Sequence, residues 1–437
     1  MRPKTVQPGS AAGRKLHFDN KLTEGDSHSF APAVLGGQMS SLNRAASFVV
    51  LFTLILRVPG LSLFPVGALI GLALLPTFWR LFVEMKPLRV IGLVSVLALI
   101  GGLLLRAALY PGVGYPGPTS AIPPLMGWLL SFPILVAAGL WALKWWSVRS
   151  AVFIALAGGL VGEFLASSSP EWKGDFGILL TMFVLVVLPK QRYIIGSLMV
   201  GVSVLVSLTA DSRVQAIFGL FVIALFATGP KFADFVRRRT VVGITIVAGI
   251  SALLINLLTY AMEVGWLGAQ IQARSIEQTS RGQSLIAGGR AEWAATFELF
   301  AHAPFGFGIG AQVNSGIQND AMSKFASVGG DYISPYLRTT VFGERVDLHS
   351  ILADLWFHFG IPGAALAVVC AVVLMMALPR AISMRNNLGL LVAFAIVNGL
   401  WDLLFSPMAN VNRVALALFL SCAVLMGDPL KREVGSK

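Results

Sequence analysis

Long, uninterrupted runs of apolar residues constrain this chain more than any other feature. Several of them extend for about 20 residues, which is the length that a helix needs to cross a lipid bilayer. The composition agrees, because 56% of the 437 residues are hydrophobic and only 12% are charged, whereas soluble domains carry about 25% charged residues. These features exclude a soluble multidomain enzyme and predict an all-α polytopic membrane protein.

Twelve apolar segments are candidates for transmembrane helices. The first is short and is interrupted by Pro59-Gly60, whereas the tenth is long enough to begin outside the bilayer. The twelve segments cover residues 45–60, 62–83, 88–109, 124–144, 149–168, 174–190, 192–209, 213–229, 239–262, 347–378, 387–405 and 410–427.

The distribution of Lys and Arg predicts the orientation, because these residues accumulate in cytoplasmic loops. With a cytoplasmic amino terminus, the inner segments hold 22 of the 33 Lys and Arg residues. The outer segments hold 11, and 6 of these belong to one long loop, where the rule has little force. Both termini are therefore expected in the cytoplasm. The net charge of +12 has the same origin, so no nucleic-acid partner is expected.

The predicted organisation has five parts, of which only the tail and one loop are sizeable outside the membrane. Within the loop, Trp293, Phe297 and Phe300 share one helical face. This pattern predicts amphipathic helices, with an interfacial helix lying on the bilayer or the wall of a substrate cavity as the two interpretations. The parts are a disordered cytoplasmic tail (1–44), helices one to nine (45–262), an outer, periplasmic loop (263–346), helices ten to twelve (347–427) and a cytoplasmic tail (428–437).

Ionisable residues in or beside membrane helices are costly and are therefore candidates for function. Most of those in this chain fall near the predicted outer face. Asp354 and His358 lie deeper in the tenth segment, one helical turn apart, where they either satisfy each other or serve the site. The candidates near the outer face are Asp211, Arg213, Arg281, Arg290, His349 and Asp402.

These residue types favour one kind of chemistry. Two arginines near the bilayer surface suit a lipid-linked diphosphate, because the guanidinium fork matches phosphate geometry and stays charged. A histidine such as His349 suits removal of a proton from an attacking hydroxyl. The sequence has no metal-ligand cluster, and Phe305–Gly310 follows no predicted strand, so no metal, nucleotide or other cofactor is expected.

One motif resembles a known family. His349-Ser350, nine residues, Gly360, two residues and Gly363 resemble the pattern of the bacterial O-antigen ligase and O-antigen or exopolysaccharide polymerase superfamily of membrane glycosyltransferases. That pattern is His, then Asn, Ser or Gln, nine residues, Gly, two residues and Gly, Thr or Tyr.

Two upstream segments extend the resemblance. Gly289 to Trp293 followed by Ala303 to Gly308 is similar to the Arg…Trp…Pro-x-Gly-x-Gly segment of the family. Asp211-Ser212-Arg213 before an apolar segment is similar to its Ser-Arg element, although Val214-Gln215 stands where many members have a small residue. The motifs cover residues 211 to 402, and the first 200 residues match only in hydropathy.

The resemblance implies a metal-independent, inverting glycosyltransferase in the bacterial inner membrane. Its donor would be an undecaprenyl-diphosphate-linked glycan, with the diphosphate held by Arg213 and Arg290. His349 would activate the acceptor hydroxyl, and Asp402 resembles a less certain acidic position of the family. Arg281 and Asp211 are further candidates for support.

The acceptor separates two reactions that share this chemistry. A ligase transfers the finished glycan to a lipid A-core sugar, and a polymerase transfers a growing chain to another lipid-linked unit. The histidine motif favours the ligase. A flippase for lipid-linked glycans is the alternative from another class, but the nine-and-three division of the segments lacks the two-half symmetry of many transporters.

Overall fold

A computed structural model gives the three-dimensional structure of the chain. The candidates Asp211, Arg281 and Arg290 lie outside the residues that it describes. The described residues are 37–56, 58, 65–109, 112–167, 172, 175–189, 193–210, 212–238, short pieces between 242 and 276, 291–328, 337–408 and 410–427.

Most of the described chain is helical, and five helices are long and apolar enough to cross a membrane. A sixth candidate is a broken span, in which α2 and the short helices α3 and α4 are bent by 72°. An all-α, membrane-like protein is thereby supported. The long helices are α5 (Lys86–Ala108), α6 (Ile122–Ala142, preceded by a 3-10 turn at Thr119–Ala121), α7 (Val148–Ala166), α16 (Ile351–Ser383) and α17 (Asn387–Phe405), and the broken span comprises α2 (Val66–Ala73), α3 (Leu75–Phe78) and α4 (Arg80–Glu84).

The remaining helices of the bundle contain shorter apolar stretches. Each overlaps one of the twelve predicted segments, whereas the predicted ninth segment, 239–262, lies mostly outside the described residues. The number of twelve spans therefore stays a prediction. These helices are α1 (Gly37–Leu54), α8 (Asp175–Val187), α9 (Tyr193–Thr209), α10 (Arg213–Arg238) and α18 (Asn410–Gly427).

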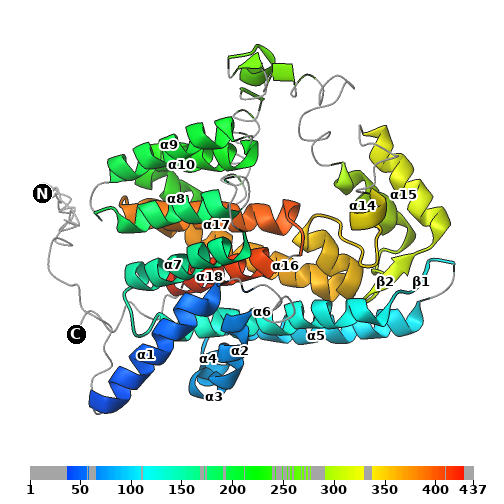
Figure 1. The fold of residues 1–437 in the computed structure, drawn as a ribbon, viewed down its shortest axis with the longest axis horizontal. Coiled ribbons are helices and arrows are strands. Elements are labelled where there is room, and N and C mark those ends of the chain that lie inside the picture. The colour runs from blue at the N-terminus through cyan, green and yellow to red at the C-terminus, as the bar shows by residue number, and fades with distance from the viewer. Residues whose placement is uncertain are drawn as a thin grey trace, which may run out of the picture.

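Helix α16 is the central element of the bundle. It packs against α5, α10, α17 and α18, and Figure 1 shows these helices running side by side. Its buried residues include Leu366 and Leu374, which belong to the main hydrophobic core. The helix that carries the histidine motif is thus held on several sides.

A close approach of two glycines fixes a kink in α16. Gly360 has a φ of 69° and a ψ of −156°, a backbone region that is essentially restricted to glycine and costs a residue with a side chain about 1–3 kcal/mol. A Cβ atom on Gly360 would lie 2.6 Å from the carbonyl oxygen of Phe305, and one on Gly306 would lie 2.9 Å from Cα of Gly360. The Pro-Phe-Gly-Phe-Gly segment therefore passes against the kink, and the glycine of the histidine motif makes room for it.

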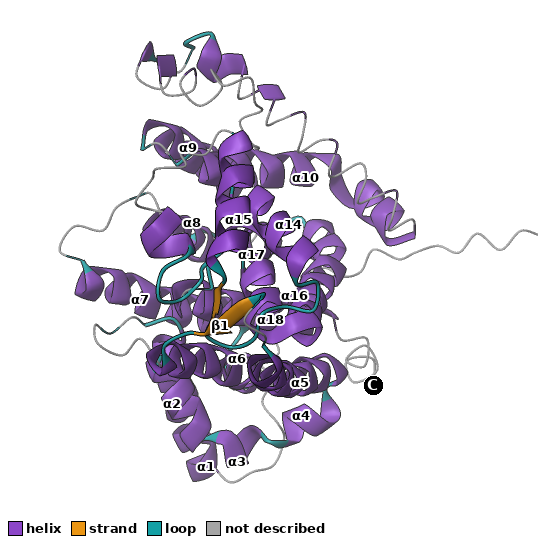
Figure 2. Ribbon diagram, turned by 90° about the vertical axis from the view of Figure 1, so that its right-hand side faces the viewer, coloured by secondary structure: helices purple, strands orange, loops and turns teal. Residues whose placement is uncertain are grey.

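The chain between α10 and α16 includes a small cap at one end of the bundle (Figures 1 and 2). The cap has its own hydrophobic cluster, in which Leu299, Phe307 and Phe325 are buried. A two-stranded antiparallel ribbon joins it to the segment that follows α5. The elements of the cap are α14 (Glu292–His302), β2 (Ala311–Val313), α15 (Ser315–Ser327) and a π-helical turn at Leu337–Val341, and the strand that pairs with β2 is β1 (Gly114–Pro116), which follows α5.

Arg106 fastens the cap to the bundle. One terminal nitrogen of its guanidinium donates to the carbonyl oxygens of Ile309 (2.9 Å) and Gly310 (3.0 Å), and the other donates to that of Gly117 (3.0 Å). This cation at the end of an apolar helix thus satisfies backbone carbonyls of the cap, which gives it a structural role.

Candidate functional site

The site is built around the turn that precedes α16. His349 has a φ of 56°, which is uncommon for a residue other than glycine. Two side chains hold this conformation. The carboxylate of Asp347 accepts a hydrogen bond from the backbone N–H of His349 at 3.0 Å, and Ser350 caps α16 by accepting one from the N–H of Ala353 at 3.2 Å. The turn therefore presents the His349 ring at the end of the bundle, with 27% of the side chain exposed.

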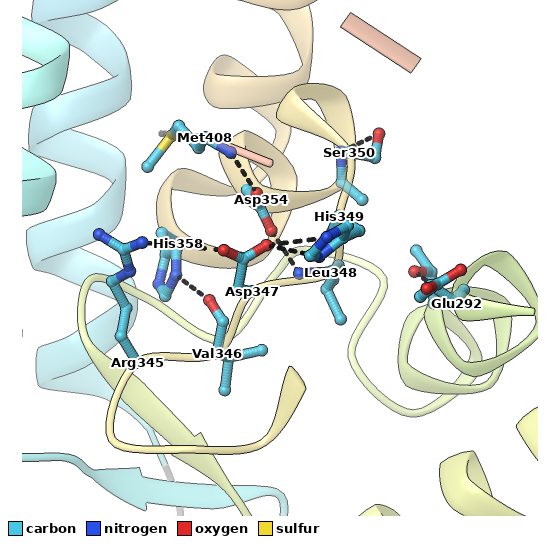
Figure 3. Close-up of polar contacts among 12 residues, drawn as sticks. Glu292, Arg345, Val346, Asp347, Leu348, His349, Ser350, Asp354, His358 and Met408 are labelled. Carbon is cyan, nitrogen blue, oxygen red and sulfur yellow. Dashed lines mark hydrogen bonds and ion pairs between the residues drawn. The ribbon is translucent and has the colours of Figure 1, made fainter. Parts of the chain in front are cut away.

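Asp347 lies between two basic side chains (Figure 3). Its Oδ1 is 3.5 Å from Nδ1 of His349, and its Oδ2 is 3.8 Å from the guanidinium of Arg345. Burial acts to raise the pKa of Asp347, but hydrogen bonds from His349 and the positive charges of His349 and Arg345 outweigh it. The pKa of this carboxyl therefore lies below its usual value of 3.8. Asp347 is ionised at neutral pH and gives His349 the carboxylate partner that orients many catalytic histidines.

Asp354 holds the turn from beneath. Its Oδ1 accepts a hydrogen bond from the N–H of Leu348 at 2.7 Å, and its Oδ2 accepts one from the N–H of Met408 at 2.9 Å. The carboxylate is buried and joins the turn to the loop that follows α17. Asp354 therefore holds together the two backbone segments that flank the site, the turn before α16 and the loop after α17.

His358 holds the same turn one helical turn further along α16. Its Nε2 lies 3.0 Å from the carbonyl oxygen of Val346, and because a carbonyl only accepts, Nε2 is the donor. The interpretation that Asp354 and His358 form a hydrogen-bonded pair is therefore wrong, because each is bonded to backbone groups instead. Their spacing places both on one face of the helix, and that face lies against the turn.

The last carbonyls of α17 accept hydrogen bonds from both the turn and the cap. Ser350 Oγ donates to the carbonyl oxygen of Leu403 at 3.3 Å. Trp293, the second residue of α14, donates through Nε1 to the carbonyl oxygen of Leu404 at 3.1 Å. Such carbonyls have no partner within their own helix and take side-chain donors. The end of α17 thereby brings together the histidine turn and the cap helix.

Asp402 lies in this last turn of α17. It accepts a hydrogen bond from Ser406 Oγ at 2.7 Å. Its neighbour Trp401 packs edge-on against Phe218 of α10, with 5.2 Å between ring centroids. The first turns of α10 therefore lie beside the helix end that carries Asp402.

The side chains of the predicted arginines lie outside the part of the chain that the structure describes. Arg213 is the first residue of α10, five residues before Phe218, and only its backbone is described. Arg290 directly precedes Ala291, the residue before α14, but it lies outside the described residues, as do Arg281 and Asp211. The structure thus gathers His349, Asp402 and the start of α10, and the binding of a diphosphate by Arg213 and Arg290 stays a prediction.

Sequence reasoning missed three parts of the site. Asp347 and Arg345 alternate with His349, and this Arg-x-Asp-x-His spacing is the signal that marks them in the sequence. The sequence marks Asp354 as a candidate, but it does not indicate that its carboxyl group accepts a hydrogen bond from the backbone of the turn.

In the described part of the chain no three His, Cys, Asp or Glu side chains form a group that could hold a metal ion. Metal independence remains a prediction.

Comparisons with known proteins give no family assignment. Neither a protein-family model nor a curated protein matches the chain. The resemblance to the O-antigen ligase and polymerase superfamily therefore rests on the motif residues alone.

Proposed function

We propose that the chain is a membrane glycosyltransferase. It transfers a glycan from an undecaprenyl-diphosphate-linked donor to an acceptor hydroxyl on the outer, periplasmic face of the bacterial inner membrane. The observation that carries the proposal is the pair formed by His349 and the ionised Asp347, held in a constrained turn at the end of a bundle of apolar helices. A base at that place meets substrates that lie in the membrane plane.

The proposed reaction is a direct displacement at the anomeric carbon. The acceptor oxygen forms the new glycosidic bond while the bond between the anomeric carbon and the diphosphate oxygen breaks, so the configuration inverts. The hydroxyl proton passes to Nε2 of His349, because Nδ1 faces Asp347. Asp347 orients the ring and stabilises the positive charge that the ring gains.

The leaving group needs positive charge, since the diphosphate gains negative charge as the bond breaks. We assign this role to Arg213 and Arg290, in keeping with the family motifs. Arg281, Asp211 and Asp402 are assigned a supporting role in the binding of the donor and acceptor. The side chain of Asp402 is held at the end of α17 by its hydrogen bond from Ser406.

The acceptor decides between two forms of the proposal. Transfer to a lipid A-core sugar makes the protein an O-antigen ligase, which is the form we favour from the histidine motif. Transfer to another lipid-linked repeat unit makes it an O-antigen or exopolysaccharide polymerase. In both forms the lipid bilayer is a partner and both chain termini lie in the cytoplasm.

The test uses the full chain in lipid nanodiscs, a synthetic polyprenyl-diphosphate glycan and a panel of acceptors. We expect glycan transfer with release of polyprenyl diphosphate, and we expect its loss in His349→Ala. The matched control is His302→Ala, because His302 lies on α14 and its ion-pair partners are Glu298 (3.4 Å) of the same helix and Asp320 (3.8 Å) of α15.

Two outcomes would overturn the proposal. Equal rates of transfer in His349→Ala and the wild type would exclude His349 as the general base. No transfer to any acceptor, combined with movement of the glycolipid across proteoliposomes, would establish a flippase instead.

A further inference from the structure

Helix α14 carries apolar residues on two different sides. One side buries Ala295 and Leu299 in the hydrophobic cluster of the cap. The other carries Phe297 and Phe300, which are 65% and 49% exposed. A helix that only covered the cap would place polar residues on this second side, so a further apolar partner is needed there.

The exposed side of α14 continues onto α16. Phe300 packs against Trp356 of α16 with 5.4 Å between ring centroids, and Trp356 donates a hydrogen bond through Nε1 to the carbonyl of Pro304 at 3.0 Å. Phe305, the next residue, is 66% exposed. The aromatic surface thus passes from α14 to a helix that is a membrane-span candidate.

From Phe305 the surface reaches α5. Phe305 lines a shallow apolar groove of about 330 Å³ together with residues of α5 and α16. In this groove Leu104 of α5 is 63% exposed and Ile361 of α16 is 56% exposed. Both belong to helices long and apolar enough to cross a bilayer, so their exposed side chains belong to the lipid-facing surface.

The opposite end of the surface reaches α17. Trp293 packs against Phe297 at 5.6 Å and edge-on against Phe405 at 6.4 Å between ring centroids. Leu404 beside it is 41% exposed. The aromatic strip, which we define as the half-buried Trp293 and the exposed Phe297, Phe300 and Phe305, therefore joins the ends of three membrane-span candidates, α17, α16 and α5.

We propose that the aromatic strip is seated in the outer leaflet of the lipid bilayer, so that α14 lies along the membrane surface with the cap above it. The strip is continuous with the lipid-facing surface of α5 and α16, and a bilayer that covers Leu104 and Ile361 also covers Phe305 beside them. Exposed apolar patches of this kind mark interaction sites, and aromatic side chains are enriched at membrane interfaces.

The polar residues of α14 agree with this placement. Glu298 and His302 lie 3.4 Å apart, and His302 faces Asp320 of α15 at 3.8 Å. Glu298 and His302 thus lie on the side of the helix that meets α15, and the aromatic rings lie on the other side. This inference does not depend on the transferase proposal, because it concerns only where α14 lies.

Site-directed spin labelling tests the placement on the full chain in nanodiscs. Labels are introduced by Phe297→Cys and Phe300→Cys, with Asn319→Cys on the exposed side of α15 as the matched control. The native Cys370 and Cys422 are buried. We expect the labels at 297 and 300 to be several-fold more accessible to dissolved oxygen, and less accessible to a water-soluble nickel chelate, than the label at 319.

Either of two results would overturn the placement. If the labels at 297 and 300 meet the nickel chelate as readily as the label at 319, the strip lies in water. If they meet neither reagent, protein covers the strip, either a second copy or another segment of the chain.

A second measurement uses the unmodified protein and so does not depend on the folding of the variants. A lipid with a photoreactive group on its acyl chain is added to the nanodiscs, and the adducts are mapped by mass spectrometry. We expect adducts in residues 292–305 and none in residues 315–327. Adducts confined to the spans would exclude α14 from the bilayer.

Discussion

The buried carboxylate of Asp354 accepts a hydrogen bond from the backbone N–H of Leu348, the residue directly before His349, at 2.7 Å. Its second oxygen is engaged as well, by the N–H of Met408 at 2.9 Å. One side chain in the first turn of α16 thus determines how the histidine turn meets the loop after α17. We therefore regard Asp354 as a positioning residue for His349.

Asp354→Asn should loosen this arrangement. An amide has only one oxygen, so its NH₂ group would face one of the two backbone N–H donors and leave it without an acceptor. A buried donor without a partner costs about 1–3 kcal/mol. We expect a lower midpoint of thermal unfolding in detergent and a lower rate of glycan transfer. Asp320→Asn on α15, where the carboxylate is 61% exposed, makes the same chemical change and should alter neither quantity.

Asp347→Asn should separate catalysis from stability. The amide oxygen can still accept the N–H of His349, so the turn is retained, but the negative charge beside the ring is lost. We expect kcat for glycan transfer to fall by about 10²–10⁴-fold, the range of a positioned acid–base group, with only a small drop in the unfolding midpoint at neutral pH, where the ionised carboxylate contributes to stability. A loss confined to KM would contradict the orienting role of the carboxylate.

The same carboxyl should make stability depend on pH. Its pKa in the folded protein lies below the usual value of 3.8, so its contribution to stability is complete above that value and is lost as the pH falls towards the lowered pKa. Below about pH 5 the unfolding midpoint of the wild type should fall more steeply than that of Asp347→Asn. Parallel curves for the two proteins would show that Asp347 does not contribute.

The sequence predicted most helices of the bundle, because long apolar runs leave few alternatives in a membrane. The segment predicted at 387–405 coincides with α17, and that predicted at 88–109 differs from α5 by two residues or fewer at each end. The tenth segment was expected from 347, but α16 begins at Ile351. Its start depends on the capping Ser350 and the left-handed His349, which hydropathy does not report.

The site was less predictable, because its contacts join residues that are far apart in the chain. Ser350 meets Leu403, and Trp293 meets Leu404 across more than 100 residues. Asp354 and His358 show the limit of spacing arguments, since a separation of four residues indicates a shared helix face but not what that face contacts. Here it contacts the turn of Val346 and Leu348.

Gly360→Ala should destabilise the fold through the kink. The new Cβ would lie 2.6 Å from the carbonyl oxygen of Phe305, at a φ of 69°. The backbone conformation alone costs about 1–3 kcal/mol, and the contact adds to it. We expect a clear drop in the unfolding midpoint, whereas Gly112→Ala, where no atom lies within 4 Å of the added Cβ, should leave it unchanged. Equal midpoints for the two variants would show that the kink tolerates a side chain.

Arg213 provides the test of the diphosphate assignment, because it begins the helix that packs beside Asp402 through Phe218 and Trp401. Arg213→Ala should lower glycan transfer by about 10²–10³-fold, as loss of one preorganised donor does. Arg213→Lys should recover little of this, since a single ammonium group cannot reproduce the bidentate fork of the guanidinium.

Arg338→Ala, which removes an exposed cation from the π-helical turn, controls for the general loss of positive charge in the same assay. Transfer that falls equally in Arg213→Ala and Arg338→Ala would mean that the site attracts its anionic donor only through overall charge. A selective loss at Arg213 that Lys fails to restore would instead require a directed contact, which is what a departing diphosphate needs.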